Sequence, residues 1–247
     1  MSNSNDHQSQ IYDDIVSDYA AIKTNVYKTQ YEEPTFWKLL GNVENKDILD
    51  LACGSGHYTR VMKQKGAKNV VGVDISKEMI AAAVAQEEND SLGIQYSVGD
   101  ATKYSFQGNN CAVFDVVTAQ YLLCYAETKA QLREFCHTAF IHTKSDGRFL
   151  TMTTICKEDN SPDHDPVHGC TYEPVNSEND GKTGWYDGVK VKITLFSGDM
   201  KKKCSFPNHA WSRGTVKSVL LDVGFDKVED HCPVETVPVV FFTAFKA

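Results

Sequence analysis

Glycines and carboxylates gather in one short region of this sequence. The segment Asp50-Leu51-Ala52-Cys53-Gly54-Ser55-Gly56 follows an apolar run, and a second acid, Asp74, ends the next apolar run. Glycine lets a chain bend tightly and lets a ligand approach the main chain, and the N–H groups that begin a helix point at such a ligand. The pattern predicts a strand, a ligand-binding turn and a helix.

Three details indicate which ligand the turn takes. A dinucleotide fingerprint needs a third glycine, in the spacing Gly-x-Gly-x-x-Gly, but His57, Tyr58 and Thr59 follow Gly56. Asp50 would repel a pyrophosphate, whereas it suits the cationic amino group of S-adenosylmethionine (SAM). Asp74 lies where an acid can take both hydroxyls of a ribose. We therefore expect SAM in preference to NAD.

Four segments resemble the motifs of class I SAM-dependent methyltransferases. They are Asp50 to Gly56, Val70 to Ser76 with Met79, Gly99-Asp100-Ala101, and Phe114 to Val117 with the following Ala119-Gln120-Tyr121-Leu122. The resemblance covers roughly residues 45 to 155. Ala52 departs from it, since many members carry glycine there.

The resemblance implies an α/β fold, with a seven-stranded, mostly parallel sheet, helices on both faces and a reversed last strand. It implies that Asp50 and Gly54 hold the methionine end of SAM, that Asp74 holds the ribose, and that S-adenosylhomocysteine is the product. It further implies that Asp100 meets the adenine amino group while Ile75 and Met79 contact the ring. The expected cofactor-binding set is Tyr19, Asp50, Ala52, Gly54, Gly56, Asp74, Ile75, Met79, Gly99, Asp100, Ala101, Gln120 and Tyr121.

We expect the acceptor pocket to be aromatic, because ring faces can hold a planar heterocycle or an ammonium centre. The candidates are Tyr12, Tyr19, Tyr121, Tyr125, Trp185 and Trp211, each with core packing as the competing interpretation. Methyl transfer from a sulfonium needs a base only if the acceptor must lose a proton, so the family has no fixed catalytic residue. Tyr19, Tyr121 and His209 are the catalytic candidates. His164 and His168 are also candidate bases, although we favour their interpretation as solvated loop histidines, and no metal site is expected.

The expected elements begin with helices over 11–23 and 33–40. Strands are then predicted over 47–51, 69–73, 94–98, 114–119 and 148–155, and helices over 57–64, 76–87 and 129–142. Such alternation predicts a parallel sheet. Further strands are expected over 189–196, 204–211, 225–230 and 237–245, with a helix over 213–222. The polar segment 157–187 is interpreted as a lid without regular structure.

These elements suggest one domain with a cap. We expect cap helices in 1–44, the SAM-binding core in 45–155, an insert or lid in 156–211, and the rest of the core in 212–247. The N-terminus is polar and no apolar stretch approaches the length of a membrane span, so a cytoplasmic protein without membrane association is expected. None of the eight cysteines is spaced as C-x-x-C, which fits a reducing setting.

The expected function is transfer of a methyl group from SAM to nitrogen or oxygen of a small metabolite. The sequence is similar to a broad group of small-molecule methyltransferases that includes toxoflavin-type enzymes. A net charge of −8 argues against nucleic acid as a partner, and a monomer or homodimer is expected. The alternatives are a protein or RNA methyltransferase, a non-catalytic SAM-binding protein and an NAD oxidoreductase.

Overall fold

The main sheet has seven strands, in the order β3-β2-β1-β4-β5-β10-β9. They are β1 (Asp47–Leu51), β2 (Asn69–Asp74), β3 (Gln95–Val98), β4 (Phe114–Gln120), β5 (Thr143–Thr154), β9 (Lys227–His231) and β10 (Val239–Phe245). Strands β1 to β5 pair in parallel, whereas β10 is antiparallel to both β5 and β9. The expected mostly parallel sheet with a reversed last strand is confirmed.

The structure is a computed structural model, and it describes residues 25–104, 113–157, 168–175, 181–197, 199 and 203–247. The helix expected over 11–23, with Tyr12 and Tyr19, lies outside these residues, as does His164. Within the described part, no helix is long and apolar enough to cross a membrane.

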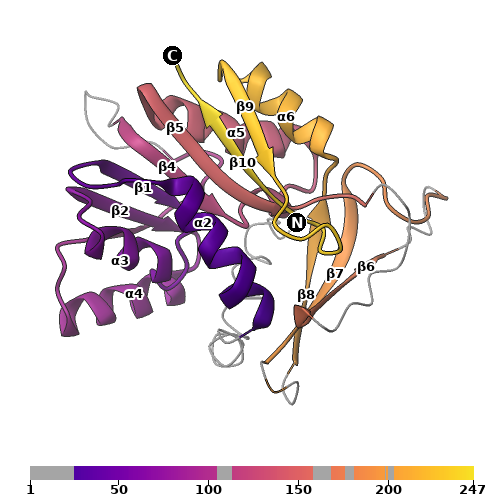
Figure 1. The fold of residues 1–247 in the computed structure, drawn as a ribbon, viewed down its shortest axis with the longest axis horizontal. Coiled ribbons are helices and arrows are strands. Elements are labelled where there is room, and N and C mark those ends of the chain that lie inside the picture. The colour runs from indigo at the N-terminus through magenta and orange to yellow at the C-terminus, as the bar shows by residue number, and fades with distance from the viewer. Residues whose placement is uncertain (1–24, 105–112, 158–167, 176–180, 198, 200–202) are drawn as a thin grey trace.

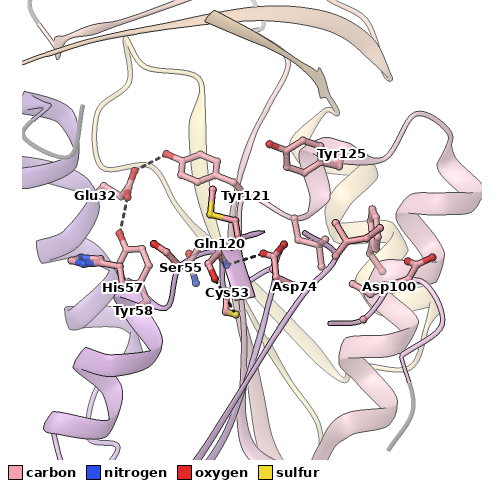
Figure 2. Close-up of a pocket in the computed structure, with 18 of the residues that line it drawn as sticks. Glu32, Cys53, Ser55, His57, Tyr58, Asp74, Asp100, Gln120, Tyr121 and Tyr125 are labelled. Carbon is pink, nitrogen blue, oxygen red and sulfur yellow. Dashed lines mark hydrogen bonds between the residues drawn. The ribbon is translucent and has the colours of Figure 1, made fainter. Parts of the chain in front are cut away.

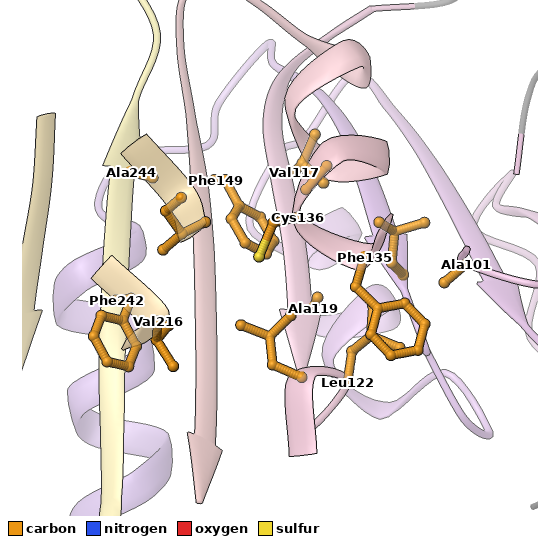
Figure 3. Packing of buried hydrophobic residues seen from close by; sticks show 14 of the residues in the cluster. Ala101, Val117, Ala119, Leu122, Phe135, Cys136, Phe149, Val216, Phe242 and Ala244 are labelled. Carbon is orange, nitrogen blue, oxygen red and sulfur yellow. The ribbon is translucent and has the colours of Figure 1, made fainter. Parts of the chain in front are cut away.

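The central strands of the main sheet, such as β1, β4 and β10, are buried on both faces because helices cover both. In β1, Ile48 packs in one core with Phe36, whereas its neighbour Leu49 packs in the other with Phe149. This follows from the two-residue period of a strand. Helices α2 (Glu33–Leu40) and α3 (His57–Gln64) contribute to the first core, while α5 (Lys129–His142) and α6 (Arg213–Asp222) contribute to the second (Figures 1 and 3).

Side-chain caps fix where several helices begin. Ser76 accepts a hydrogen bond from the Met79 N–H at the start of α4 (Lys77–Asn89), and Thr128 and Ser212 cap α5 and α6 in the same way. The helix expected over 33–40 is present, but it continues an unexpected π-helical turn, η1 (Lys28–Glu32). A single 3₁₀ turn, η2 (Leu123–Tyr125), follows β4.

One expected strand boundary in the main sheet is wrong. Strand β5 begins at Thr143, directly after α5, and not at Arg148. The pairing shifts register there, since Phe114 lies opposite Thr143 but Val116 lies opposite Arg148. Asp146 has a left-handed φ of 60° in the extra residues. This bulge lengthens the strand in a way that hydrophobic periodicity does not show.

A second sheet of three antiparallel strands has the order β6-β7-β8. Its strands are β6 (Cys170–Pro174), β7 (Val189–Phe196) and β8 (Lys203–Ala210). The expectation of no regular structure in 157–187 is wrong for β6, because Cys170 and Tyr172 turn into the core. Pro174 fits an edge strand. Figure 1 shows this sheet as a separate layer beside the helix formed by η1 and α2.

Candidate functional site

A cavity lies at the carboxyl ends of β1 to β4. Strand β1 sits between β2 and β4, so the chain order reverses there, and ligands of open α/β sheets bind at such a point. The segments that follow the strands line the cavity together with η1 and α3. The lining residues are Lys28, Glu32, Ala52, Cys53, Gly54, Ser55, His57, Tyr58, Asp74, Ile75, Met79, Gly99, Asp100, Ala101, Gln120, Tyr121, Leu122, Tyr125 and Phe135.

The turn after β1 leaves room for a ligand at one glycine and not at the other. Gly54 has a φ of 54°, and a side chain added there would meet nothing within 4 Å. Gly56 also has a positive φ, of 84°, but an added Cβ would collide with the Tyr96 hydroxyl. Gly54 therefore lines the cavity, whereas Gly56 begins α3 and packs against Tyr96. Ala52 has a φ of 56°, a conformation that costs a non-glycine residue about 1–3 kcal/mol.

Asp74 joins two of the segments that line the cavity. Its carboxylate accepts hydrogen bonds from the N–H of Gly54 at 2.7 Å and from the N–H of Ser76 at 2.9 Å. Burial raises the pKa of this carboxyl, and the backbone hydrogen bonds oppose that rise. A carboxylate has about four lone-pair sites, so these two bonds leave acceptor capacity for ligand hydroxyls.

Asp50 is not among the cavity-lining residues. It is 2% exposed, and its two oxygens accept hydrogen bonds from Thr59 Oγ1 at 2.6 Å and from Thr118 Oγ1 at 2.7 Å. Burial, with a smaller contribution from the charge of Asp74, raises the pKa of Asp50 to about 6. The carboxylate thus links α3 to β4 beneath the turn. Its expected contact with the amino group of SAM stays a prediction.

Two residues at the carboxyl end of β4 carry unusual features: Gln120, which ends the strand, and Tyr121, which follows it. The side-chain oxygen Oε1 of Gln120 is buried and has no hydrogen-bond partner, although its Nε2 lies 3.4 Å from the Leu150 carbonyl oxygen. Tyr121 has a left-handed φ of 59°. Such strain collects at functional sites, where the surrounding structure enforces it. Both residues were expected at the site, and both line the cavity.

Glu32 was not expected at the site. Its Oε1 accepts a hydrogen bond from the Tyr58 hydroxyl at 2.6 Å, and its Oε2 accepts one from the Tyr121 hydroxyl at 2.7 Å (Figure 2). Figure 2 shows Glu32 on one side of Tyr121 and Asp74 and Asp100 on the other. In the sequence, Glu32 reads as an ordinary acid at the start of a helix. Nothing in the spacing predicts the π-helical turn that carries it.

Five more of the expected cofactor residues also line the cavity. Gly99, Asp100 and Ala101 follow β3, and Ile75 and Met79 follow β2; all five line the cavity. Asp100 Oδ1 accepts hydrogen bonds from the Thr102 N–H and hydroxyl, each at 2.8 Å, and these bonds orient the carboxylate.

The expected acceptor-side aromatics divide into two groups. Tyr121 and Tyr125 line the cavity. Trp185 and Trp211 belong to the two hydrophobic cores, and the Trp211 indole N–H donates to the Ala126 carbonyl oxygen at 3.1 Å. His209 lies on β8 opposite Lys190, away from the cavity-lining residues, and burial lowers its pKa. None of these three side chains is among the cavity-lining residues, and their expected roles stay predictions.

The described residues show no metal centre. No group of three or more His, Cys, Asp or Glu side chains within them could hold an ion. The ring of His168 packs edge-on against Tyr31, with 5.4 Å between the centroids. The seven described cysteines are all free thiols.

Comparisons with known proteins agree with this geometry. Residues 48–147 match a family model described as a methyltransferase domain. An uncharacterized protein of Haemophilus influenzae is 31% identical over 43% of this chain and 42% of its own length. An mRNA cap guanine-N(7) methyltransferase of Caenorhabditis elegans is 28% identical over 62% of this chain and 45% of its own length. A demethylmenaquinone methyltransferase of Lactococcus lactis is 29% identical over 45% of this chain and 45% of its own length. The chain spans less than half the length of these relatives.

A solved structure extends the similarity to almost the whole chain. The SAM-dependent methyltransferase from Clostridium acetobutylicum superposes with a TM-score of 0.63 over 99% of both chains, at 18% identity. An identity this low shows the fold alone. The fold is that of class I methyltransferases, and residues 48–147 are similar to a methyltransferase domain. SAM is the cofactor that these similarities support.

Proposed function

We propose that this chain is a SAM-dependent methyltransferase whose acceptor is a small molecule. The observation that carries the proposal is the cavity itself. It joins carboxylates suited to a nucleoside with a group of tyrosines and a buried acid, at the carboxyl ends of β1 to β4. Within the family, we place the chain in the small-molecule branch that includes toxoflavin-type enzymes.

The residues present fit SAM. The partnerless Gln120 oxygen suits an α-ammonium group, the open space beside Gly54 suits the methionine chain, and Asp74 keeps acceptor capacity for ribose hydroxyls. On the far side of Tyr121, Asp100 would hold the adenine amino group and Ile75 and Met79 would contact the ring. Asp50 would contribute indirectly, by holding α3 against β4 through its hydrogen bonds with Thr59 and Thr118.

Most of what the chain contributes to the reaction is positioning. Bound SAM supplies an activated methyl group on a sulfonium sulfur. The protein must orient the acceptor toward that carbon and exclude water. Tyr58, Tyr121 and Tyr125 border the space in which an acceptor would lie, and the main-chain strain at Tyr121 shows that its position is enforced.

We further propose that the sheet β6–β8 covers the acceptor. The position of Tyr172 on β6 supports this proposal. The pKa of the Tyr121 hydroxyl is raised by burial, by the charge of Glu32 and by Tyr172, so Tyr172 lies near the cavity residue Tyr121. A covered site suits a metabolite better than a macromolecule. The net charge of −8 also weakens attraction to RNA.

A labelled-methyl screen tests the proposal. The protein is incubated with methyl-labelled SAM and, separately, with a metabolite extract, total RNA and a protein extract. We expect the label in the metabolite pool and at least a tenfold loss in Asp74→Ala, which lacks the ribose ligand. Label in RNA or protein alone would contradict a small-molecule acceptor, and no transfer to any pool would contradict the enzyme activity.

A further inference from the structure

Glu32 is a buried acid at the edge of the cavity. Its side chain is 6% exposed, and burying a charge is costly unless partners compensate for it. The two phenolic hydrogen bonds fix its orientation, but neither donor carries a charge. The cation nearest to it in the described ion pairs is Lys28, whose Nζ lies 3.9 Å from Oε1, at the limit of an ion pair.

Two more phenols lie within electrostatic reach of this carboxylate. Burial and then the charge of Glu32 raise the pKa of Tyr27, and burial, Cys170, Tyr27 and Glu32 raise the pKa of Tyr172. The Tyr27 hydroxyl is buried and has no hydrogen-bond partner. Glu32 thus accepts hydrogen bonds from Tyr58 of α3 and from Tyr121, which follows β4, and its charge also acts on Tyr27 and on Tyr172 of β6. Aromatic rings with a carboxylate are the surroundings that bind organic ammonium ions.

The charges lining the cavity favour the same kind of ligand. Glu32, Asp74 and Asp100 are acids, while Lys28 is the only lysine or arginine among the lining residues that the structure describes. In a site of low dielectric, an excess of carboxylates attracts cations strongly. SAM itself carries a positive charge on sulfur, and a second cation would still be accommodated.

We propose that the acceptor is an amine that is protonated at neutral pH, and that Glu32 binds its ammonium group and takes its proton. This inference rests on the proposed function and names the substrate class. The α-ammonium of SAM has another candidate partner, the partnerless Gln120 oxygen. Figure 2 places Glu32 on the side of Tyr121 opposite to Asp74 and Asp100, away from the carboxylates assigned to the nucleoside.

The proton transfer has a simple balance. An N–H bond of the ammonium breaks, its proton moves to a Glu32 carboxylate oxygen, and the bonding pair stays on nitrogen as a lone pair. That lone pair forms the N–C bond while the methyl–sulfur bond of SAM breaks, and the sulfur keeps the electron pair. The products are a methylated ammonium, S-adenosylhomocysteine and a protonated Glu32, which then returns its proton to water.

The first experiment identifies the class of acceptor. A metabolite extract is separated on a cation exchanger at pH 7 into cationic and non-cationic pools, and each pool is offered to the protein with labelled SAM. We expect the label to enter compounds of the cationic pool. Transfer only to the non-cationic pool would overturn the amine inference while leaving the proposed function intact. No transfer to either pool would contradict the proposed function as well.

The second experiment tests Glu32 itself, with Glu33→Gln as the matched control. Glu33 is adjacent but turns toward His57, with 2.9 Å between Oε1 and Nε2. In Glu32→Gln we expect turnover of the cationic pool at pH 7 to fall about a hundredfold or more, since a general base contributes at least that much. Affinity for S-adenosylhomocysteine, measured by calorimetry, should stay within about threefold of wild type.

The pH profile separates a chemical role from a structural one. Without the Glu32 carboxylate, only amine that is already deprotonated reacts. The rate of Glu32→Gln should therefore rise about tenfold per pH unit below the pKa of the amine. Wild type should show a flatter profile, and Glu33→Gln should follow wild type. Parallel profiles for wild type and Glu32→Gln would overturn the proposal. So would a loss of S-adenosylhomocysteine affinity as large as the loss of rate, because Glu32 would then bind the donor.

Discussion

Replacing Asp74 tests how the cavity holds SAM. The carboxylate accepts two backbone N–H groups, at 2.7 and 2.9 Å, and we propose that it also accepts the two ribose hydroxyls. Asp74→Ala removes both interactions with the ribose. A hydrogen bond to a charged group contributes about 1.5–3 kcal/mol, so the affinity for S-adenosylhomocysteine should fall at least about tenfold.

The same substitution also loosens the turn. The N–H groups of Gly54 and Ser76 lose their acceptor, and each buried group left unpaired costs about 1–3 kcal/mol of folding free energy. Calorimetry must therefore be done well below the melting temperature of the variant. Ser76→Ala is the control, because it removes the cap of α4 at a cost of about 0.5–2 kcal/mol and leaves the carboxylate in place.

The two variants should separate ligand binding from stability. We expect Ser76→Ala to lose stability with an affinity close to wild type, and Asp74→Ala to lose both. An unchanged dissociation constant in a folded Asp74→Ala would refute the assignment to the ribose. An equal loss of affinity in Ser76→Ala would show that the turn, and not the carboxylate, determines binding.

Three further predictions follow from single residues. The pKa of Asp50 is about 6 in the fold, against the ordinary 3.8, so wild type loses stability as pH rises through this range. Relative to wild type, Asp50→Asn should gain about 2.5 kcal/mol of unfolding free energy between pH 4 and 7.5 in urea unfolding, and a constant difference would contradict the buried charge. Tyr121→Phe removes one phenolic hydrogen bond to Glu32, so turnover should fall about tenfold or more. Normal turnover would show that the Tyr121 hydroxyl does not contribute to the reaction. Ala52→Gly relieves a left-handed φ and should raise the free energy of unfolding by about 1 kcal/mol, whereas a loss of stability would show that no strain is stored there.

Much of the architecture was predictable because its signals are local. The helices 57–64, 129–142 and 213–222 carry periodic apolar residues between clear caps and stops, and their bounds agree with α3, α5 and α6. The turn at Gly54 and the acid at Asp74 were recognisable for the same reason. Each is set by residues adjacent in the chain.

What could not be predicted depends on contacts between distant segments. Strand β6 is polar in sequence and becomes a strand only because β7 pairs with it. The bulge at the start of β5 depends on register with β4. Asp50 was expected in the cavity, but Thr59 and Thr118 together hold it beneath the turn. Glu32 meets Tyr121 across 89 positions, a distance at which residue type and spacing carry no information.

The central claim is that the cavity at the ends of β1 to β4 binds SAM. Calorimetric titration of the wild-type protein with S-adenosylhomocysteine, and separately with NAD, tests it most directly. We predict saturable binding of one S-adenosylhomocysteine per chain, displaced by SAM, and no measurable heat with NAD. Binding of NAD in place of S-adenosylhomocysteine, or binding of neither, would contradict the claim.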